Sequence, residues 1–324
     1  MQITSIENDK IRIDFLDIGG TILNFIKKDN QTNYILRYDN LEQYRDNDDY
    51  FLGANIGRNA GRTVPAWYIN YQKKKVYLDK NEGPSHLHGG RHGTQFQNFT
   101  CHQISPNKAE LTLYDNNPYY EDAEITIVYS LTDNHFDIEY FGESLVPTIF
   151  NFTNHMYFNL DTVKEESSNI LDHWLKLADA KIQMLDQNGL PIDKFIDLDS
   201  TTDKLINFSS EKKIGKSLKS NHSMLEKANG GLDFAYRFLD NKNEPQVELY
   251  DSTKTNGLLI SSNQEASVIY TLNKSNDKLL LNNGMSSEKY RGVTFEMQRL
   301  PNYVHHADKI LESSYYSHIR YTVV

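Results

Sequence analysis

Two segments with glycine beside basic residues could bind a polar ligand. Gly57–Thr63 reads GRNAGRT, with two arginines in seven residues. It fits a surface turn with solvated arginines, or an arginine held rigidly beside a polyol to donate in-plane hydrogen bonds to its hydroxyls. The segment lacks the strand–helix setting and the trailing Lys-Ser/Thr of a phosphate loop, so it gives nucleotide binding little support.

The second segment, HLHGG, places His86 and His88 two residues apart. On an extended chain such residues share a face, so we expect both imidazoles to point the same way. The pair could hold a metal ion or do acid–base work, and His92 nearby mildly favours the metal. Gly89 and Gly90 would let backbone or ligand approach closely.

A third segment, FNFTNHMYFNL, places His155 among Asn and Tyr side chains that could hydrogen-bond to it. This pattern fits a proton-transfer site, and it fits a structural histidine satisfied in the core equally well.

The fourth segment, GVTFEMQRLP, has the pattern of a strand, with Thr294, Glu296 and Gln298 on one side. A carboxylate in an apolar strand is costly to bury without partners, which indicates a function or a salt bridge. Arg299 is not the expected partner, because residues an odd number apart in a strand face opposite ways. A weaker fifth segment ends at Asp233, for which a turn aspartate is the simple interpretation.

The elements that must position these residues follow a period of two rather than 3.6. Apolar residues alternate with polar ones through 123–131, a Thr-Asp-Asn turn follows, and the alternation resumes over 136–140, which predicts a β-hairpin. Similar runs occur at Ile11–Leu16, Thr21–Ile26, Lys75–Leu78, Leu111–Tyr114, Val247–Tyr250, Leu258–Ile260, Ser267–Leu272 and Tyr316–Val323. Leu41–Arg45 and Glu211–Leu218 are each expected to be a short helix.

Many short strands without helix-length segments between them predict an all-β fold, a large sandwich rather than a parallel α/β sheet. No repeat, Pro-rich linker or low-complexity tract marks a boundary in the 324 residues. The stretch 161–229 is more polar, but apolar pieces recur through it. We therefore expect one domain over residues 1–324.

Composition limits the partners. The net charge is −10 with no basic block, so we expect no nucleic-acid partner. No apolar run approaches the roughly 18 residues that span a bilayer, and charges near the start leave no readable export signal, so no membrane partner is expected. Cys101 is the only cysteine, which excludes an intrachain disulfide and a cysteine-based zinc site. A cytoplasmic location fits best.

In chain order, the segments GRNAGR, LHGG, TNHMYFNL, GLD and EMQRLP resemble the aldose 1-epimerase (mutarotase, galactose mutarotase-like) family. That family shows G-R-x-A-[NG]-R, L-H-G-G, T-N-H-x-Y-F-N-L, G-x-D and E-x-Q-x-x-P in the same order. TNHMYFNL is the most specific match, and the five together span Gly57 to Pro301. LDQNGLP also looks like the family's L-D-x-x-x-x-P segment.

The resemblance implies a galactose mutarotase-like supersandwich of antiparallel strands with few short helices. It implies an enzyme that interconverts the α and β anomers of a free aldohexose, such as galactose or glucose, by opening and reclosing the ring without cofactor or metal. Carried over residue by residue, Glu296 is the general base and His155 the general acid. Arg62, His88 and Asp233 would bind the sugar.

Departures from the family pattern are Thr63, Phe234 and Asn302, and the last two bear on substrate preference more than on the reaction.

The sequence also leaves three alternative functions open. One is an epimerase of a sugar phosphate, which Arg58 and Arg62 would suit. The others are a non-catalytic carbohydrate-binding protein and a metal enzyme that uses His86, His88 and His155. The sequence leaves open the preferred aldose, the roles of His86 and His92, and whether the chain forms a homodimer.

Overall fold

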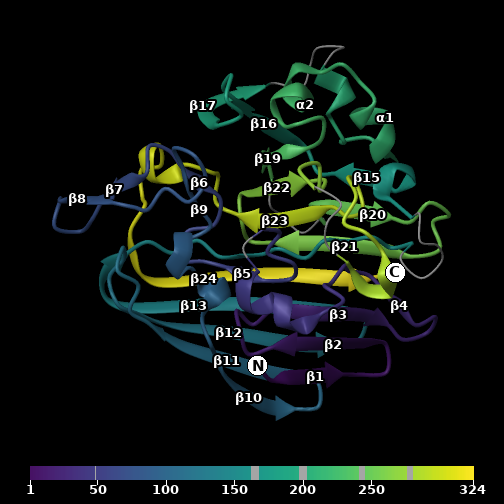
Figure 1. The fold of residues 1–324 in the computed structure, drawn as a ribbon, viewed down its shortest axis with the longest axis horizontal. Coiled ribbons are helices and arrows are strands. Elements are labelled where there is room, and N and C mark those ends of the chain that lie inside the picture. Colours follow the sequence, from purple (N-terminus) through teal and green to yellow (C-terminus); the bar gives the residue numbers. More distant parts are fainter. Residues whose placement is uncertain (48, 162–167, 197–202, 241–244, 276–279) are drawn as a thin grey trace.

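A nine-stranded antiparallel sheet runs through the whole molecule (Figure 1). The computed structural model describes residues 1–324 except 48, 162–167, 197–202, 241–244 and 276–279. In sheet order the strands are β10 (Thr100–Ser105), β11 (Lys108–Asp115), β12 (Ala123–Thr132), β13 (His135–Thr148), β24 (Glu312–Val323), β21 (Gly257–Ser262), β20 (Val247–Tyr250), β15 (Trp174–Leu177) and β18 (Lys212–Lys213).

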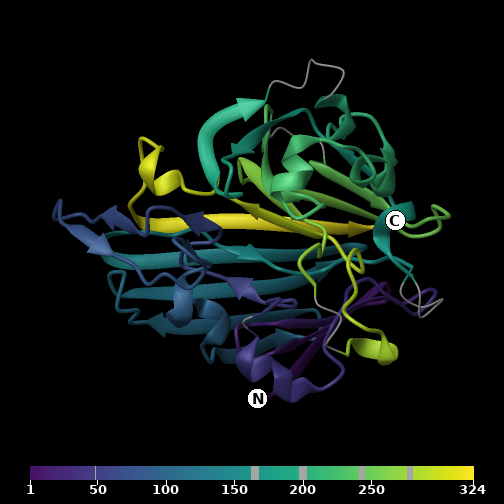
Figure 2. The same ribbon diagram turned by 45° about the horizontal axis from the view of Figure 1, so that its top comes forward.

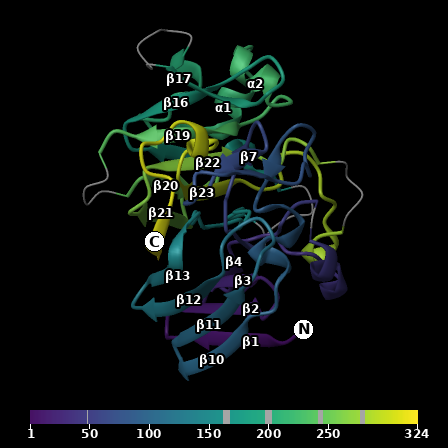
Figure 3. The same ribbon diagram turned by 90° about the vertical axis from the view of Figure 1, so that its left-hand side faces the viewer.

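Two smaller sheets pack on this large one. Figures 2 and 3 show the four-stranded sheet beside β10–β13 and the five-stranded sheet beside β15, β20 and β21. The first contains β1 (Ile3–Glu7), β2 (Ile11–Leu16), β3 (Ile22–Lys27) and β4 (Thr32–Asn33). The second has the order β17 (Pro191–Ile196), β16 (Ala180–Leu185), β19 (Asp233–Phe238), β22 (Ala266–Tyr270) and β23 (Thr294–Gln298).

One hydrophobic cluster fills the space between the large sheet and both small ones. On the four-stranded side, the rings of Phe25 and Phe136 meet edge to face at 5.5 Å. On the five-stranded side, Phe158 lies 6.2 Å from Phe295 on β23 and 5.7 Å from Tyr321 on β24. Such aromatic contacts add to the burial of apolar area that stabilises a sandwich.

Short strand pairs and 3-10 helices connect the sheets and bring the motif segments together. The pairs are β5 (Asn55–Ile56) with β14 (Thr153–Asn154), β6 (Arg62–Thr63) with β9 (His86–Leu87), and β7 (Trp67–Ile69) with β8 (Lys75–Tyr77). The 3-10 helices are η1 (Leu41–Asp46), η2 (Gly90–His92), η3 (Thr94–Phe96), η4 (Ile170–Asp172), η5 (Asp203–Leu205), η6 (Asn282–Gly284) and η7 (Tyr303–His305). Within the described residues, α-helix is limited to α1 (Ile214–Leu218) and α2 (Ser223–Lys227).

The predicted all-β sandwich is confirmed, as is the hairpin now seen as β12–β13. Thr132 pairs with His135, so the turn has two residues, and Asp133 adopts φ 52° there. The strand predicted over Ser267–Leu272 is too long: β22 ends at Tyr270, because Leu272 adopts φ 48° in the left-handed region.

The helix predictions are confirmed in part. Leu41–Arg45 lies within a 3-10 helix that extends to Asp46. The prediction for 211–218 is wrong at its start, because Lys212–Lys213 pairs with β15 as β18 before α1 begins.

Across the described ranges, no helix is long and apolar enough to cross a membrane.

Arg58 is fully buried and anchors the segment that leads to Arg62. Its guanidinium lies 3.4 Å from Asp115 and donates to the Glu121 carbonyl at 2.6 Å and to Thr148 Oγ1 at 2.7 Å. Burial lowers the pKa of Arg58, and the Asp115 carboxylate opposes that effect. A charge buried this deeply loses its solvation by water, so its partners must compensate for that loss.

We predict that Asp115→Ala lowers the free energy of unfolding by about 3–5 kcal/mol, because it leaves the buried guanidinium uncompensated. Urea denaturation followed by circular dichroism measures the change. The control is Glu248→Gln, which removes an exposed pair with Lys176 (2.8 Å) and should cost at most about 1 kcal/mol. Equal effects of the two substitutions would contradict the prediction.

Candidate active site

A cleft lies on one face of the five-stranded sheet, and each of the five strands lines it. The strands contribute, among others, Leu185 (β16), Pro191 (β17), Asp233 (β19), Val268 (β22) and Glu296 (β23). Residues of β6, β9 and the segments that follow β9 and β14 line it as well. The cleft therefore unites all five sequence motifs.

Strand register places two carboxylates on the cleft face. Val268 lies opposite Glu296, and Tyr270 lies opposite both Asp233 and Thr294. Because residues two apart share a face of a sheet, Asp233 and Glu296 must point to the same side. The predicted common side of Thr294 and Glu296 also agrees with the 3.3 Å hydrogen bond from Thr294 Oγ1 to Glu296 Oε1.

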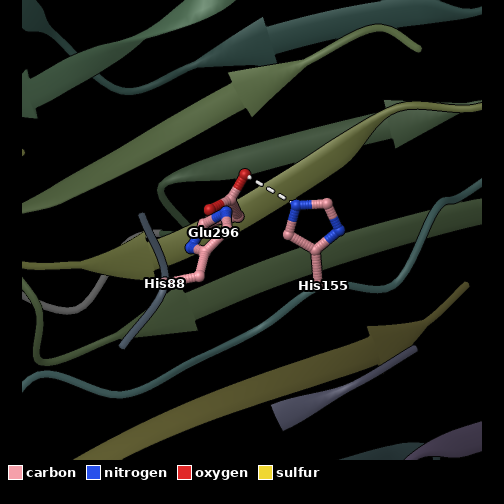
Figure 4. A group of neighbouring side chains, drawn as sticks. All are labelled: His88, His155 and Glu296. Atoms are coloured by element: carbon pink, nitrogen blue, oxygen red, sulfur yellow. Dashed lines mark ion pairs between the residues drawn. The ribbon is translucent and has the colours of Figure 1, made fainter. Parts of the chain in front are cut away.

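His155 and Glu296 form a buried contact in the cleft (Figure 4). The Nε2 atom of His155 lies 3.3 Å from Glu296 Oε1, and the two side chains are only 5% and 3% exposed. Among the described residues, Oε2 of Glu296 and Nδ1 of His155 have no hydrogen-bond partner. Burial alone would raise the pKa of Glu296, but the charge and hydrogen bond of His155 hold it below the ordinary glutamate value.

His88 lies beside this pair in a fixed protonation state (Figure 4). The backbone N–H of Gly61 donates to His88 Nδ1 at 3.2 Å, so a neutral ring carries its proton on Nε2. Burial and the neighbouring His155 and Arg62 charges lower the pKa of His88 to about 3. His88 is therefore a neutral hydrogen-bond donor at neutral pH.

Arg62 and Asp233 belong to a network of four charges. Arg62 binds Glu82 through two bonds, at 2.5 and 2.7 Å, and reaches the Asp233 oxygens at 3.3 and 3.4 Å. Lys274 Nζ lies 2.9 Å from Asp233 Oδ2 and 3.8 Å from Glu82 Oε1. Burial would raise the pKa of Asp233, yet Arg62 and Lys274 lower it to about 2.

All five residues assigned by resemblance, namely Arg62, His88, His155, Asp233 and Glu296, thus line one cleft. Asp233 begins β19, so the interpretation as a turn residue is wrong. A tyrosine lies beside His155 as expected, but His155 Nδ1 has no hydrogen bond to an Asn or Tyr among the described residues. The rings of Phe51, His88 and Tyr157 lie within 5.8 Å of it.

Three basic residues considered from the sequence lie elsewhere. Arg58 pairs with Asp115 in the interior. The expectation that His86 and His88 point the same way is wrong, because β9 ends at Leu87 and His88 adopts φ 54°. His86 instead contacts the Asp79 carboxylate at 2.6 Å and the Tyr120 hydroxyl at 2.9 Å. His92 is exposed and packs near Tyr119.

Glu82 and Lys274 were missed by the sequence reasoning. Both are charged residues in loops, a pattern that a solvated surface shows equally well. Glycine-proline after Glu82 was the only local signal of an ordered turn there.

Comparison with known proteins agrees with the motifs. The family model for aldose 1-epimerase matches residues 2–314. Maltose epimerase from Levilactobacillus brevis is 28% identical over 306 residues, which cover 92% of this chain and 85% of that protein. Aldose 1-epimerase from Haemophilus influenzae is 27% identical, with 95% of this chain and 89% of that protein covered.

The crystal structure of galactose 1-epimerase from Lactobacillus acidophilus superposes with a TM-score of 0.86 at 26% identity. The superposition covers 99% of this chain and 94% of that one. The chain belongs to the aldose 1-epimerase family, whose members are carbohydrate isomerases. This confirms the resemblance, and with it the galactose mutarotase-like sandwich.

His88, His155 and Glu296 are also the one group of three among the described residues whose ligand atoms could surround a metal ion, since these lie within 4.8 Å of one another. His86, which the metal alternative required, is not in this group. A metal-bound histidine normally donates the N–H of its other nitrogen to an acceptor. Nδ1 of His88 instead accepts from Gly61, so its Nε2 holds a proton where a metal would have to bind.

We therefore predict that extended dialysis against EDTA leaves the rate of anomer interconversion unchanged. The measurement is polarimetry before and after dialysis, with metal content checked in the same samples. A loss of activity that added zinc or manganese restores would contradict the prediction and place the ion among His88, His155 and Glu296.

Proposed function

We propose that this protein interconverts the α and β anomers of a free aldose by general acid–base catalysis. The observation that carries the proposal is the buried contact of His155 Nε2 with Glu296 Oε1 at 3.3 Å in the cleft. A carboxylate base and an imidazole acid in a cleft with little water can move two protons in one reaction.

The reaction requires a proton to leave the anomeric hydroxyl while another reaches the ring oxygen. These two oxygens are bonded to the same carbon, so acid and base can serve both from neighbouring positions, as the 3.3 Å spacing allows. Glu296 accepts the hydroxyl proton and His155 donates to the ring oxygen, which opens the ring to the aldehyde. Rotation about the bond next to the aldehyde, then reclosure with the roles reversed, gives the other anomer.

The remaining cleft residues bind and orient the sugar in this proposal. His88 offers its Nε2–H as a fixed donor, because its Nδ1 is occupied by Gly61. Asp233, held ionised by Arg62 and Lys274, is a permanent acceptor for a sugar hydroxyl. Binding groups of this kind hold the reacting carbon against the acid–base pair.

Charge favours a free sugar over a sugar phosphate. Four carboxylates line the cleft, those of Asp49, Glu82, Asp233 and Glu296, against the two permanent cations of Arg62 and Lys274. Both cations are already paired with carboxylates, and Arg58 lies in the interior. A phosphate dianion would therefore meet net negative charge.

A non-catalytic sugar-binding protein would have no need to bury an acid–base pair.

The relatives named above act on maltose or galactose by their names, or on aldoses in general. All these sugars have a free anomeric hydroxyl, which is the group that the proposed chemistry requires. We propose an aldohexose such as galactose or glucose as the substrate.

The cytoplasm is the location we propose, since a single cysteine suits a reducing compartment. A single domain and a homodimer likewise remain proposals.

We expect Glu296→Gln to lower kcat by about 10²–10⁴-fold, because the amide keeps the shape and cannot accept the proton. Polarimetry of freshly dissolved α-anomers, corrected for spontaneous mutarotation, measures the rate. Glu248→Gln is the matched control and should leave kcat unchanged. Near-wild-type turnover by folded Glu296→Gln would refute the assignment of the base.

The rate should also depend on pH in a predictable way. Glu296 must be ionised to act, and its pKa is lowered, so the acid limb of kcat/KM should have its midpoint below the ordinary glutamate pKa. His155 is the proposed acid, so His155→Gln should remove most of the activity. His86→Gln should keep most of it, since His86 does not line the cleft. Near-wild-type turnover by folded His155→Gln would point to another acid.

A further inference from the structure

Exposure increases steadily from one end of the cleft to the other. The side chains of His155 and Glu296 are 5% and 3% exposed, and Asp233 is 11% exposed. Glu82 and Lys274 are 33% and 39% exposed. The reacting pair therefore lies at the closed end, and Glu82 and Lys274 lie at the mouth.

This gradient orients any sugar that reacts there. Its anomeric carbon must reach His155 and Glu296 at the closed end. The opposite side of the ring, with its C3 and C4 hydroxyls, then faces outward. The groups near the mouth are the ones that can contact those hydroxyls.

The two cations near the mouth, Arg62 and Lys274, differ in how many of their hydrogen-bond donors are already used. Arg62 is nearly saturated, since its Nε, Nη1 and Nη2 all face the carboxylates of Glu82 and Asp233. Lys274 has three N–H donors, and one of them reaches Asp233 Oδ2 at 2.9 Å. Its 3.8 Å distance to Glu82 is too long for a hydrogen bond. Among the contacts of the described residues, Lys274 therefore keeps donors that a ligand could use.

Acceptors are available beside those donors. Arg62 occupies each oxygen of Glu82 once, and a carboxylate oxygen accepts about two hydrogen bonds. Arg62 thus fixes the Glu82 carboxylate with lone pairs to spare. A hydroxyl placed between Glu82 and Lys274 could donate to the first and accept from the second.

We propose that Glu82 and Lys274 are specificity-determining residues, which together bind a sugar hydroxyl remote from the anomeric carbon, at C3 or C4. The inference rests on the proposed function, because the orientation of the sugar follows from where it reacts. Glucose and galactose differ in configuration only at C4, so these two residues set the preference between them where the bound hydroxyl is that of C4. A position that pairs a charged donor with a charged acceptor also disfavours a sugar that lacks the hydroxyl.

The test is steady-state kinetics of Lys274→Met and Glu82→Gln on D-glucose, D-galactose, 3-deoxy-D-glucose and 4-deoxy-D-glucose. We expect the wild type to show a KM for one deoxy sugar that is about 10- to 100-fold above that for glucose, the loss typical of a hydrogen bond to a charged group. Lys274→Met should raise the KM for glucose to a similar extent with kcat within about threefold, because only uniform binding is lost. It should remove most of the discrimination against that deoxy sugar. Lys274→Arg should restore part of it.

The control is Lys176→Met, which removes an exposed pair with Glu248 outside the cleft and should leave all constants unchanged. Glu82→Gln should reproduce the rise in KM. If Lys274→Met fails to fold, Glu82→Gln alone tests the inference. The inference is overturned if KM stays within twofold of the wild type. It is also overturned if KM rises equally for glucose and the deoxy sugars, or if kcat falls in proportion. A wild type that fails to interconvert any aldose would instead refute the proposed function.

Discussion

Glu296 reaches the cleft because β23 pairs with β22 in one register, in which Val268 lies opposite Glu296. On the other face of β23, Phe295 and Met297 belong to the main hydrophobic cluster. A slip of one residue would turn every side chain of the strand over, so Glu296 would enter the apolar core and two large apolar side chains would face the cleft. The free energy that keeps Phe295 and Met297 buried therefore also keeps the carboxylate beside His155.

The second constraint is the close approach of backbone segments from distant parts of the chain. Gly61 adopts φ 77°, and a Cβ atom there would lie 2.7 Å from Gln298 Nε2. In this conformation its N–H fixes the tautomer of His88. Gly89 adopts φ 72°, and a Cβ there would lie 2.2 Å from the Gly57 carbonyl oxygen. Glycines in the GRNAGR and LHGG motifs thus allow the two segments to meet, which agrees with the close approach expected of Gly89.

How far the sequence predicts the structure depends on the range of the interactions involved. Alternation and a two-residue turn are local, so the β12–β13 hairpin could be predicted. The site residues could be assigned only through their motifs, since no local pattern shows that His155 and Glu296 meet. The prediction that His86 and His88 share a face is wrong, because alternation assumes an extended chain and His88 adopts φ 54°. The pairing of Lys274 with Asp233 depends on how the loop after β22 folds back over the start of β19, and charge alone does not reveal that.

Two carboxylates on one sheet face have different partners, and the partners decide what each can do. Asp233 is held by Arg62 and Lys274, which keep its pKa at about 2, so it stays an anion throughout the accessible pH range. Glu296 is held mainly by His155, an imidazole that can itself give up or take a proton. A carboxylate paired with permanent cations suits a fixed acceptor, and one paired with a titratable ring suits proton exchange. The division between binding and chemistry that we propose therefore follows from which cation each carboxylate meets.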